Sequence, residues 1–284
     1  MGPSRSPTLP SAASLDAYFD AVPRPDTDPV EAGPFTLFVS RRPWGYYARP
    51  ALAHRGALAG ADIDRLGDVC QDYGVELTIE WVGQVHPELA AVAAQRGLDV
   101  HTYTLMAAAP GQGPAAVPEV PGTRVRVLSG DEPDAVEILA DARATANVAF
   151  DCPHGAPGPD LPGPAERDAN AARMGPELLA HIHARAQSGL TVTAVAESDD
   201  DGVLATGCYQ PVAATAEIVG VATLPSARRR GLATLLTAVL AAHARQRGVR
   251  TLVLSAQDEA VARIYGRVGF VPIGTSHSAE RARA

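Results

Sequence analysis

Lysine is absent from this 284-residue chain, so all 24 of its basic residues are arginine. Cysteine is scarce: Cys70, Cys152 and Cys208 lack the spacing of a zinc or redox motif, which favours reduced thiols and predicts neither a disulfide nor a metal site. No segment approaches the roughly 20 consecutive apolar residues of a membrane helix. The first 20 residues also lack the apolar centre of a signal peptide. We therefore expect a soluble protein of the cytoplasm that has no membrane partner.

The charge balance excludes a further class of partner. Asp and Glu total 32, which gives a formal net charge of −8. A chain without a basic face is poorly suited to bind nucleic acid, whereas a cationic partner suits it better. Abundant Ala, Gly, Pro and Arg without Lys is typical of a GC-rich genome and indicates a bacterial source.

A linker divides the chain. Residues 109–123, APGQGPAAVPEVPGT, are rich in Pro and Gly and show neither helical nor strand periodicity. Since 284 residues suit two modest domains, we predict an N-terminal domain at 1–108 and a C-terminal domain at 124–284.

The C-terminal part reads as alternating elements. VRVLS predicts a strand, and SGDEPD predicts a helix start with Ser129 or Asp131 near the cap and Pro133 in the first turn. After a loop rich in Pro and Gly at 151–164 we expect a single second helix ending near Ser188. Three strands of an antiparallel meander follow, LTVTAVAES, GVLATGCYQPV and ATAEIVGVATL, and then helix, strand, helix and strand.

The helix after the third of these strands has an unusual start. Arg228, Arg229 and Arg230 stand at its N-terminus, where the dipole already makes the helix end positive. An anion that accepts hydrogen bonds from the amides of Gly231 and the next two residues removes this conflict, and a phosphate suits the position. The alternative is that Ser226 caps an earlier start and the arginines are merely solvated.

These residues carry a family resemblance. Arg228 to Ala233 reads RxxGxA, which resembles the pyrophosphate loop of the Gcn5-related N-acetyltransferases, the GNAT superfamily. Downstream, LVLSAQDEAVARIYGRVGFVPIG at 252–274 resembles the closing segment of that family, with a Tyr before a Gly-Phe pair. The resemblance, strong over about 125–274, implies the α/β (α+β) GNAT fold, a mixed, mostly antiparallel sheet flanked by helices.

The region before the linker repeats the closing half of this order. FTLFVSRR, VELTIEWV and LDVHTYTLM predict strands, with helices at ADIDRLGDVCQDYG and HPELAAVAAQRG between them. Gly74 and Gly97 occupy the same positions in this order as Gly248 and Gly269 do in the C-terminal part. Ala93, however, occupies the position of Tyr265. We interpret residues 1–108 as a degenerate GNAT-like half domain with no second active site. An unrelated α/β appendage is the alternative.

Two side chains are candidates for catalysis. Glu217 lies in AEIVGVAT, where strand alternation predicts one face shared with Val219, Val221 and Thr223. A carboxylate among apolar residues is costly unless it is used or paired, and burial raises its pKa toward that of a base. Its place resembles that of the general base in histone-type GNAT enzymes, and Tyr265 resembles the family's general acid. An arginine-paired Glu217 and a structural Tyr265 are the alternatives.

The resemblance implies acetyl-CoA as co-substrate. The residues expected to bind it are Val221, Ala222, Thr223, Arg228, Arg229, Arg230, Gly231, Leu232, Ala233 and Thr234. The implied function is N-acetyl transfer to a primary amine of a small molecule or peptide. A non-catalytic acyl-CoA-binding or regulatory module and an enzyme with another acyl donor or a hydroxyl acceptor are the alternatives. The sequence leaves the acceptor and the oligomeric state, a homodimer included, open.

Overall fold

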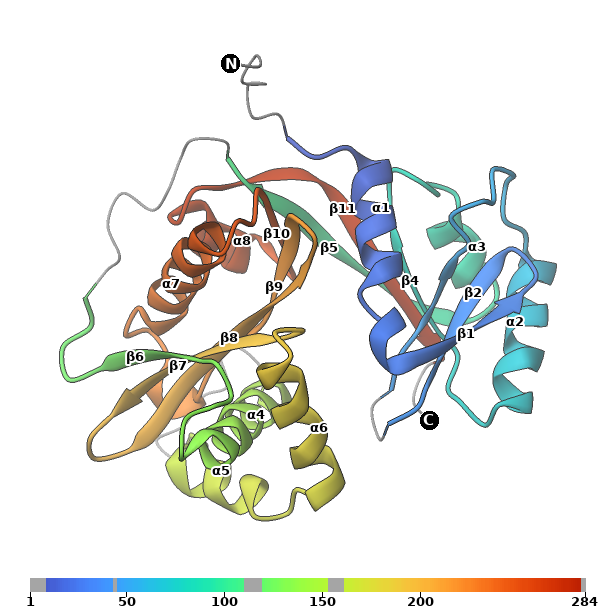
Figure 1. The fold of residues 1–284 in the computed structure, drawn as a ribbon. Coiled ribbons are helices and arrows are strands. Elements are labelled where there is room, and N and C mark those ends of the chain that lie inside the picture. The colour runs from blue at the N-terminus through green and yellow to red at the C-terminus, as the bar shows by residue number, and fades with distance from the viewer. Residues whose placement is uncertain (1–8, 43–44, 110–118, 153–160, 282–284) are drawn as a thin grey trace. The chain divides into compact units, whose positions relative to one another are not determined.

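The protein, seen here as a computed structural model, is described at residues 9–42, 45–109, 119–152 and 161–281 (Figure 1). These residues form two compact units. The first holds the described residues up to 107 with 255–262 and 272–281; the second holds those of 108–254 with 263–271. The linker predicted at 109–123 falls largely outside the described residues, at 110–118, and the domain boundaries stay a prediction.

The second unit is built on a sheet with strand order β10-β9-β8-β7-β6. Its strands are β6 (Arg124–Leu128), β7 (Val192–Ser198), β8 (Gly202–Val212), β9 (Thr215–Thr223) and β10 (Thr251–Ala256). Neighbours pair antiparallel except β10 and β9, which are parallel. The mixed, mostly antiparallel sheet and the predicted meander are therefore confirmed.

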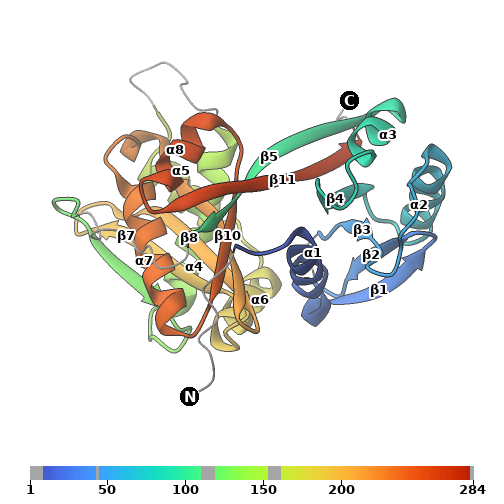
Figure 2. The ribbon, with the colours of Figure 1, turned by 90° about the horizontal axis from the view of Figure 1, so that it is seen from above.

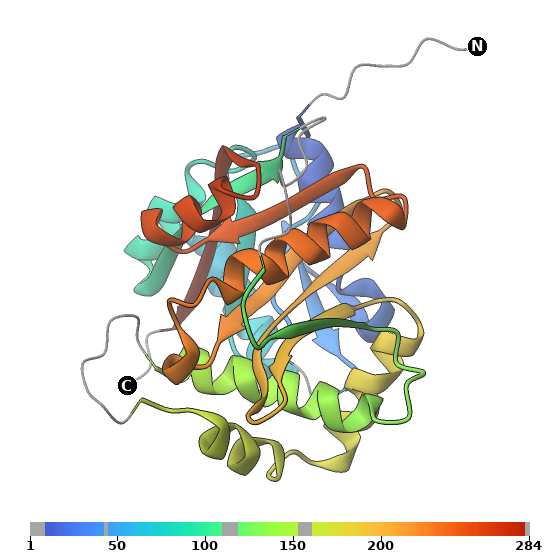
Figure 3. The same ribbon diagram turned by 90° about the vertical axis from the view of Figure 1, so that its left-hand side faces the viewer.

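Helices cover both faces of this sheet. α7 (Leu232–Gln246) packs on one face, whereas α4 (Ala135–Asp151) lies on the other with α5 (Pro164–Ala171) and α6 (Pro176–Gln187) (Figures 1 and 3). The prediction of one helix between α4 and β7 is wrong, because two helices, α5 and α6, lie there. The helical segment is split at Gly175 and Pro176 because proline disfavours helical geometry in the residue before it and begins α6 at its first turn.

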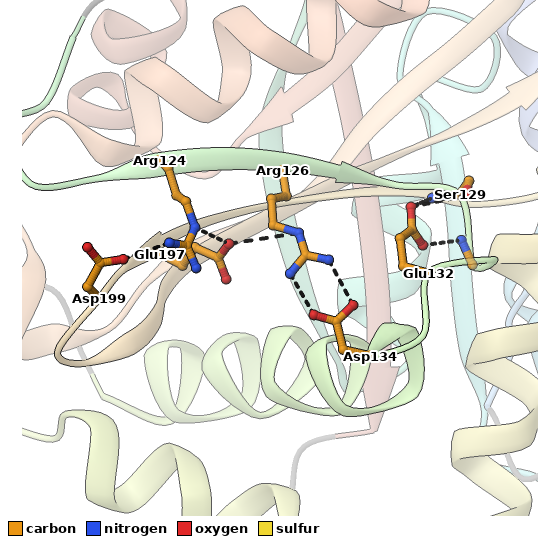
Figure 4. Close-up of polar contacts among 8 residues, drawn as sticks. Arg124, Arg126, Ser129, Glu132, Asp134, Glu197 and Asp199 are labelled. Carbon is orange, nitrogen blue, oxygen red and sulfur yellow. Dashed lines mark hydrogen bonds and ion pairs between the residues drawn. The ribbon is translucent and has the colours of Figure 1, made fainter.

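The start of α4 also differs from the prediction, because its polar residues serve other contacts (Figure 4). Asp134, which precedes the helix, accepts two hydrogen bonds from Arg126, at 2.8 and 2.9 Å. Glu132 accepts hydrogen bonds from the Ser129 amide and hydroxyl. On β7, the buried Glu197 accepts a 2.8 Å hydrogen bond from Arg124. These contacts join β6 to β7 and to the start of α4.

The strands of the first unit follow the order β1-β2-β3-β4-β11-β5. Its strands are β1 (Thr27–Ala32), β2 (Phe35–Ser40), β3 (Ala48–Pro50), β4 (Thr78–Val82), β5 (Leu98–Ala108) and β11 (Phe270–Arg281). α1 (Ala12–Ala21) lies on one side of it, and α2 (Gly60–Asp72) and α3 (Leu89–Gln95) lie on the other (Figure 2). The main core packs Phe35, Ile79 and Trp81 against Leu66 and Leu89.

The local repeat inferred from the sequence has a physical counterpart. Gly74, Gly97, Gly248 and Gly269 all have positive φ, between 65° and 94°, which glycine adopts without strain at the end of a helix. The backbone bonds match as well. The amide after Gly74 bonds to the Cys70 carbonyl at 2.9 Å, and the amide after Gly248 bonds in the same way five residues back at 3.0 Å.

Two features of the first unit have no counterpart in the sequence analysis. β11, the last strand of the described chain, pairs antiparallel with β4, with Ser278 opposite Glu80. Burial raises the pKa of Glu80 to about 7, although the charge of Arg49 lowers it.

The sequence also did not predict α1 and β1. α1 is capped by the Ser11 hydroxyl, which accepts a hydrogen bond from the Ser14 amide at 3.2 Å.

Candidate active site

The two parallel strands of the second unit stay paired over only part of their length. β10 pairs with β9 from Thr251↔Thr215 to Leu254↔Ile218, whereas β9 continues to Thr223. On this side of β9, the backbone beyond Ile218 is outside that pairing. Backbone N–H and C=O groups at such an edge are suited to bind an extended ligand as an added strand.

A β-bulge changes the direction of the side chains in this part of β9. The β8–β9 register shifts between Cys208↔Val219 and Thr206↔Ala222, so Gly220 and Val221 together oppose one residue, Gly207. Gly220 has φ +64°, a conformation that glycine adopts without strain.

The bulge overturns one prediction about the faces of β9. The partners place Ala222 on the face of Glu217 and Val219, where it packs on α4, and place Thr223 on the opposite face. Val221 also leaves the expected face, because a Cβ built on Gly207 would meet both Val221 and Leu240 of α7. The prediction that Glu217, Val221 and Thr223 share one face of the strand is therefore wrong.

Glu217 lies on the α4 side of the sheet, opposite Gln210 of β8. Two arginines share its surroundings through the neighbouring thiol of Cys208. Burial raises the pKa of Cys208 to about 12; the charge of Arg185 lowers it, that of Glu217 raises it and that of Arg143 lowers it. Burial also lowers the pKa of Arg143. Candidate partners for an arginine-paired Glu217, Arg143 and Arg185, thus act on the same thiol as Glu217 does.

The loop after β9 turns directly into α7. Arg229 (φ +65°) and Gly231 (φ +89°) are left-handed, and α7 begins at Leu232 with no side-chain cap. The alternative start is wrong, because Ser226 lies in a separate 3-10 turn, Pro225–Ala227. The first amides of α7 are therefore the kind of uncapped N–H groups to which an anion binds.

Arg228 uses its side chain within the protein. Its Nη2 donates to the carbonyl of Ala149 at 2.8 Å and to that of Cys152 at 2.9 Å, at the C-terminal end of α4. A guanidinium there satisfies helix-end carbonyls and complements the helix dipole. By contrast, Arg229, Arg230 and Gly231 are exposed. The structure thus separates one anchoring arginine from two arginines at the surface of the loop.

Tyr265 lies near the end of α8 (Glu259–Gly266) and is only 8% exposed. Its ring centroid is 6.4 Å from that of Phe270, and burial raises its pKa to about 12. The hydroxyl is therefore protonated across the neutral range. Asp258 accepts a hydrogen bond from the Val261 amide at 2.8 Å and so caps α8.

The structure brings most of the candidate residues into one continuous segment. Glu217, the bulge at Gly220 and the loop amides all lie between residue 217 of β9 and the first turn of α7. Tyr265 belongs to the same compact unit, on another element. Arg143, Arg185 and Gln210 were not singled out from the sequence. Only Gln210 had a usable signal, since extending the predicted hairpin register places it opposite Glu217.

The comparisons with known proteins agree with this geometry. Residues 160–270 match the profile of the Acetyltransferase (GNAT) family. The chain is similar to a GCN5-related N-acetyltransferase from Kribbella flavida, with TM-score 0.66 and 22% identity over 97% of this chain and 98% of that one. It is also similar to a tandem GNAT protein from the clavulanic acid biosynthesis pathway, with TM-score 0.54 and 17% identity over 88% and 79% of the two chains. No curated protein sequence matches the chain.

Residues 160–270 are thus a domain of the GNAT acetyltransferase family, and the fold of the chain is that of GNAT proteins, tandem ones included. The resemblance read from the sequence and the enzyme class, an acyltransferase, are confirmed. In the described part of the chain, no group of three or more His, Cys, Asp and Glu side chains is arranged to hold a metal. None of the helices there is both long and apolar enough to cross a membrane.

Proposed function

We propose that this protein is an acetyl-CoA-dependent N-acetyltransferase that acetylates a primary amine of a small molecule or peptide by direct attack on the thioester. The observation that carries the proposal is the sequence of features along β9. The strand leaves its parallel neighbour after Ile218, bulges at Gly220 and runs into the uncapped start of α7. An extended ligand with a terminal phosphate fits this order of groups.

The backbone supplies the binding groups in this proposal. Amides of Val221, Ala222 and Thr223 are expected to pair with the extended part of acetyl-CoA and to polarise the thioester carbonyl. The amides of the loop and the first turn of α7 are expected to bind its pyrophosphate, with Arg229 and Arg230 adding positive charge at the surface. When bound, acetyl-CoA supplies an activated acetyl group.

The side chains handle the protons. An ammonium has no lone pair, so Glu217, directly or through a water, is proposed to take one proton from the acceptor before its nitrogen forms the bond to the acetyl carbon. As the carbon–sulfur bond breaks, Tyr265 is proposed to give its proton to the departing sulfur. The nitrogen loses its second proton as the amide forms, and that proton restores the Tyr265 hydroxyl. A tyrosine with a pKa near 12 is protonated at neutral pH, so it holds the proton that this role requires.

The binding half of the proposal is tested by thermal unfolding with and without acetyl-CoA. A ligand that binds only the folded state stabilises it by about 2.7 kcal/mol at 100 times its Kd. The variants are Gly231→Asp and, as a matched control, Gly231→Asn, which has the same shape without the charge. Asn tolerates the left-handed conformation at this position, and a Cβ there meets only Val120, at 3.8 Å. We expect acetyl-CoA to stabilise the wild type and the Asn variant but not the Asp variant.

The catalytic half is tested by release of free thiol with a panel of amines. We expect Glu217→Gln and Tyr265→Phe each to lower kcat by about 10²- to 10⁴-fold while acetyl-CoA still stabilises both variants. Binding without turnover for any amine would favour the non-catalytic module instead. A panel of alcohols and of longer acyl-CoA donors distinguishes the remaining alternative, an enzyme with another acceptor or donor.

A further inference from the structure

Part of one sheet face in the first unit is polar. On the other face, Trp81 of β4 and Ala279 of β11 belong to the main core with α2 and α3. Strand alternation therefore turns Glu80 and Ser278, their neighbours, toward the side of α1. Tyr103 of β5 lies on this side too, because its hydroxyl is 3.4 Å from Oγ of Ser278. Glu80, Ser278 and Tyr103 are all partly exposed, so a ligand from solvent can reach a carboxylate and two hydroxyls on neighbouring strands.

The carboxylate of Glu80 lacks a hydrogen-bond donor. Among the described residues it accepts no hydrogen bond and forms no ion pair. Burial raises its pKa to about 7, and the charge of Arg49, which lowers the pKa, offsets only part of this effect. A crowded carboxylate without a donor is costly to ionise, so a ligand that donates hydrogen bonds to it gains affinity.

The positive charge of Arg49 is already engaged. Arg49 is 2% exposed, and its Nη2 donates to Asp16 of α1 at 3.0 Å. Its guanidinium carbon also lies 5.2 Å from the centre of the Phe19 ring. Because Asp16 balances Arg49, an ionised Glu80 leaves these three charged groups with an excess of negative charge. The charge at this place therefore favours a cation.

Glu80 and Ser278 are placed to share one ligand. They are direct partners in the antiparallel pairing of β4 and β11, and the Cβ atoms of such partners lie about 4.5–5.5 Å apart. No hydrogen bond joins their side chains in the described part of the chain, where Ser278 contacts Tyr103 instead. A ligand group with several donors can therefore bond to the carboxylate and the hydroxyl together. A primary ammonium has three N–H donors and the complementary charge.

We propose that Glu80 and Ser278 bind the primary ammonium group of a small organic cation on the α1 side of these strands. The ammonium donates one hydrogen bond to the carboxylate of Glu80 and one to Oγ of Ser278, whose own hydrogen turns toward the Tyr103 oxygen. A charge-assisted hydrogen bond is about twice as strong as a neutral one, so the charge of the ligand decides its affinity. The site lies wholly within the first unit and does not depend on acetyl transfer.

Binding at this site varies with pH, because the ammonium binds the ionised form of Glu80. With a pKa of about 7, Glu80 is mostly ionised at pH 8 and mostly protonated at pH 6. The affinity is therefore expected to fall about tenfold between these two values. The other titratable groups on this side, by contact or by strand alternation, are Asp16, Arg49, Tyr103, His101 and Glu280. Since histidine is the residue type that titrates near neutral pH, His101→Gln is the control, in which the pH dependence should persist.

The test is a titration of the full chain with n-propylammonium chloride at constant ionic strength, at pH 8 and pH 6. The affinity is measured from the NMR signals of the ligand, so the same readout serves every variant. ¹³C-labelled glutamate carboxyl groups locate the site, and Glu80→Gln identifies the signal of Glu80. We expect saturable binding that shifts this signal. The neutral analogue 1-propanol is expected to bind at least about tenfold more weakly, because it lacks the charge.

Three variants test the two contacts. Glu80→Gln is expected to weaken n-propylammonium binding by about tenfold or more, and Ser278→Ala by about threefold or more. Asp68→Asn, which removes an exposed charge from α2 on the other side of the strands, should leave it unchanged. Glu80→Gln is expected to fold, since it replaces a crowded carboxylate with a neutral amide. The proposal is overturned if the wild type shows no saturable binding, if 1-propanol binds equally well, if pH has no effect, or if Glu80→Gln or Ser278→Ala binds as tightly as the wild type.

Discussion

The side chain of Arg228 has two possible roles. The structure shows it anchoring the loop to α4, whereas the sequence predicted that it binds the phosphate of acetyl-CoA. Its Nη2 donates to two carbonyls at the end of α4, at 2.8 and 2.9 Å. Hydrogen bonds from a charged donor contribute about 1.5–3 kcal/mol each. Since one nitrogen serves both carbonyls, we expect Arg228→Ala to lower the free energy of unfolding of the second unit by about 2–3 kcal/mol without any ligand.

The assay is urea denaturation followed by far-UV circular dichroism, since both tryptophans, Trp44 and Trp81, precede residue 108 and report on the first unit. Arg230→Ala is the matched control, because Arg230 is exposed in the same loop. It is expected to leave unfolding without ligand unchanged and to weaken acetyl-CoA binding, by the loss of one positive charge. If Arg228→Ala matches the wild type without ligand and loses only acetyl-CoA affinity, the anchoring role is refuted.

Three further predictions concern Glu80, Glu197 and Gly207. Because burial raises the pKa of Glu80 from 4.5 to about 7, its contribution to stability is complete below pH 4.5 and is lost as the pH rises through 7. Glu80→Gln should therefore stabilise the protein by about 1–3 kcal/mol at pH 8 and much less at pH 5, as measured by urea denaturation at both values. Glu197→Gln should destabilise the second unit by about 1–3 kcal/mol, whereas Asp199→Asn, whose side chain is 87% exposed, should leave the midpoint unchanged. Gly207→Ala should cost about 1–2 kcal/mol, because its Cβ would lie 3.1 Å from Leu240; Gly266→Ala, with open space around its Cβ, is the control.

The parts of the fold that the sequence predicted are those determined by local chemistry. Alternation of apolar residues predicted the meander of β7, β8 and β9, and glycines predicted the ends of helices such as α2 and α7. The pairing of β11 with β4 joins residues about 200 positions apart, and no local pattern specifies such a partner. The predicted start of α4 was wrong for a similar reason: Asp134, the residue before the helix, accepts hydrogen bonds from Arg126 of β6, which lies outside the local sequence pattern of the helix.

The site shows the same division. The start of α7 followed from the Arg-Gly sequence, which is local. The faces of β9 did not, because a bulge depends on the partner strand as well as on the sequence of β9. The shift of register at Gly220 became visible only against Gly207 of the partner strand. The role of Arg228 likewise required knowing where α4 ends.

The two units also show how one local framework can carry different chemistry. Both end their helices at glycines of positive φ with matching backbone bonds, so the repeated part is the part that sets the chain direction. The loops between strand and helix differ. In the second unit, exposed arginines precede an uncapped helix, which favours an anion. In the first unit, the corresponding loop after β3 carries His54 and is followed by α2, where Asp62 accepts from the Ala59 amide at 2.9 Å. That carboxylate near the helix start repels an anion. The corresponding loop of the first unit therefore differs from the phosphate loop proposed for the second, because a carboxylate already bonds to an amide at the start of its helix.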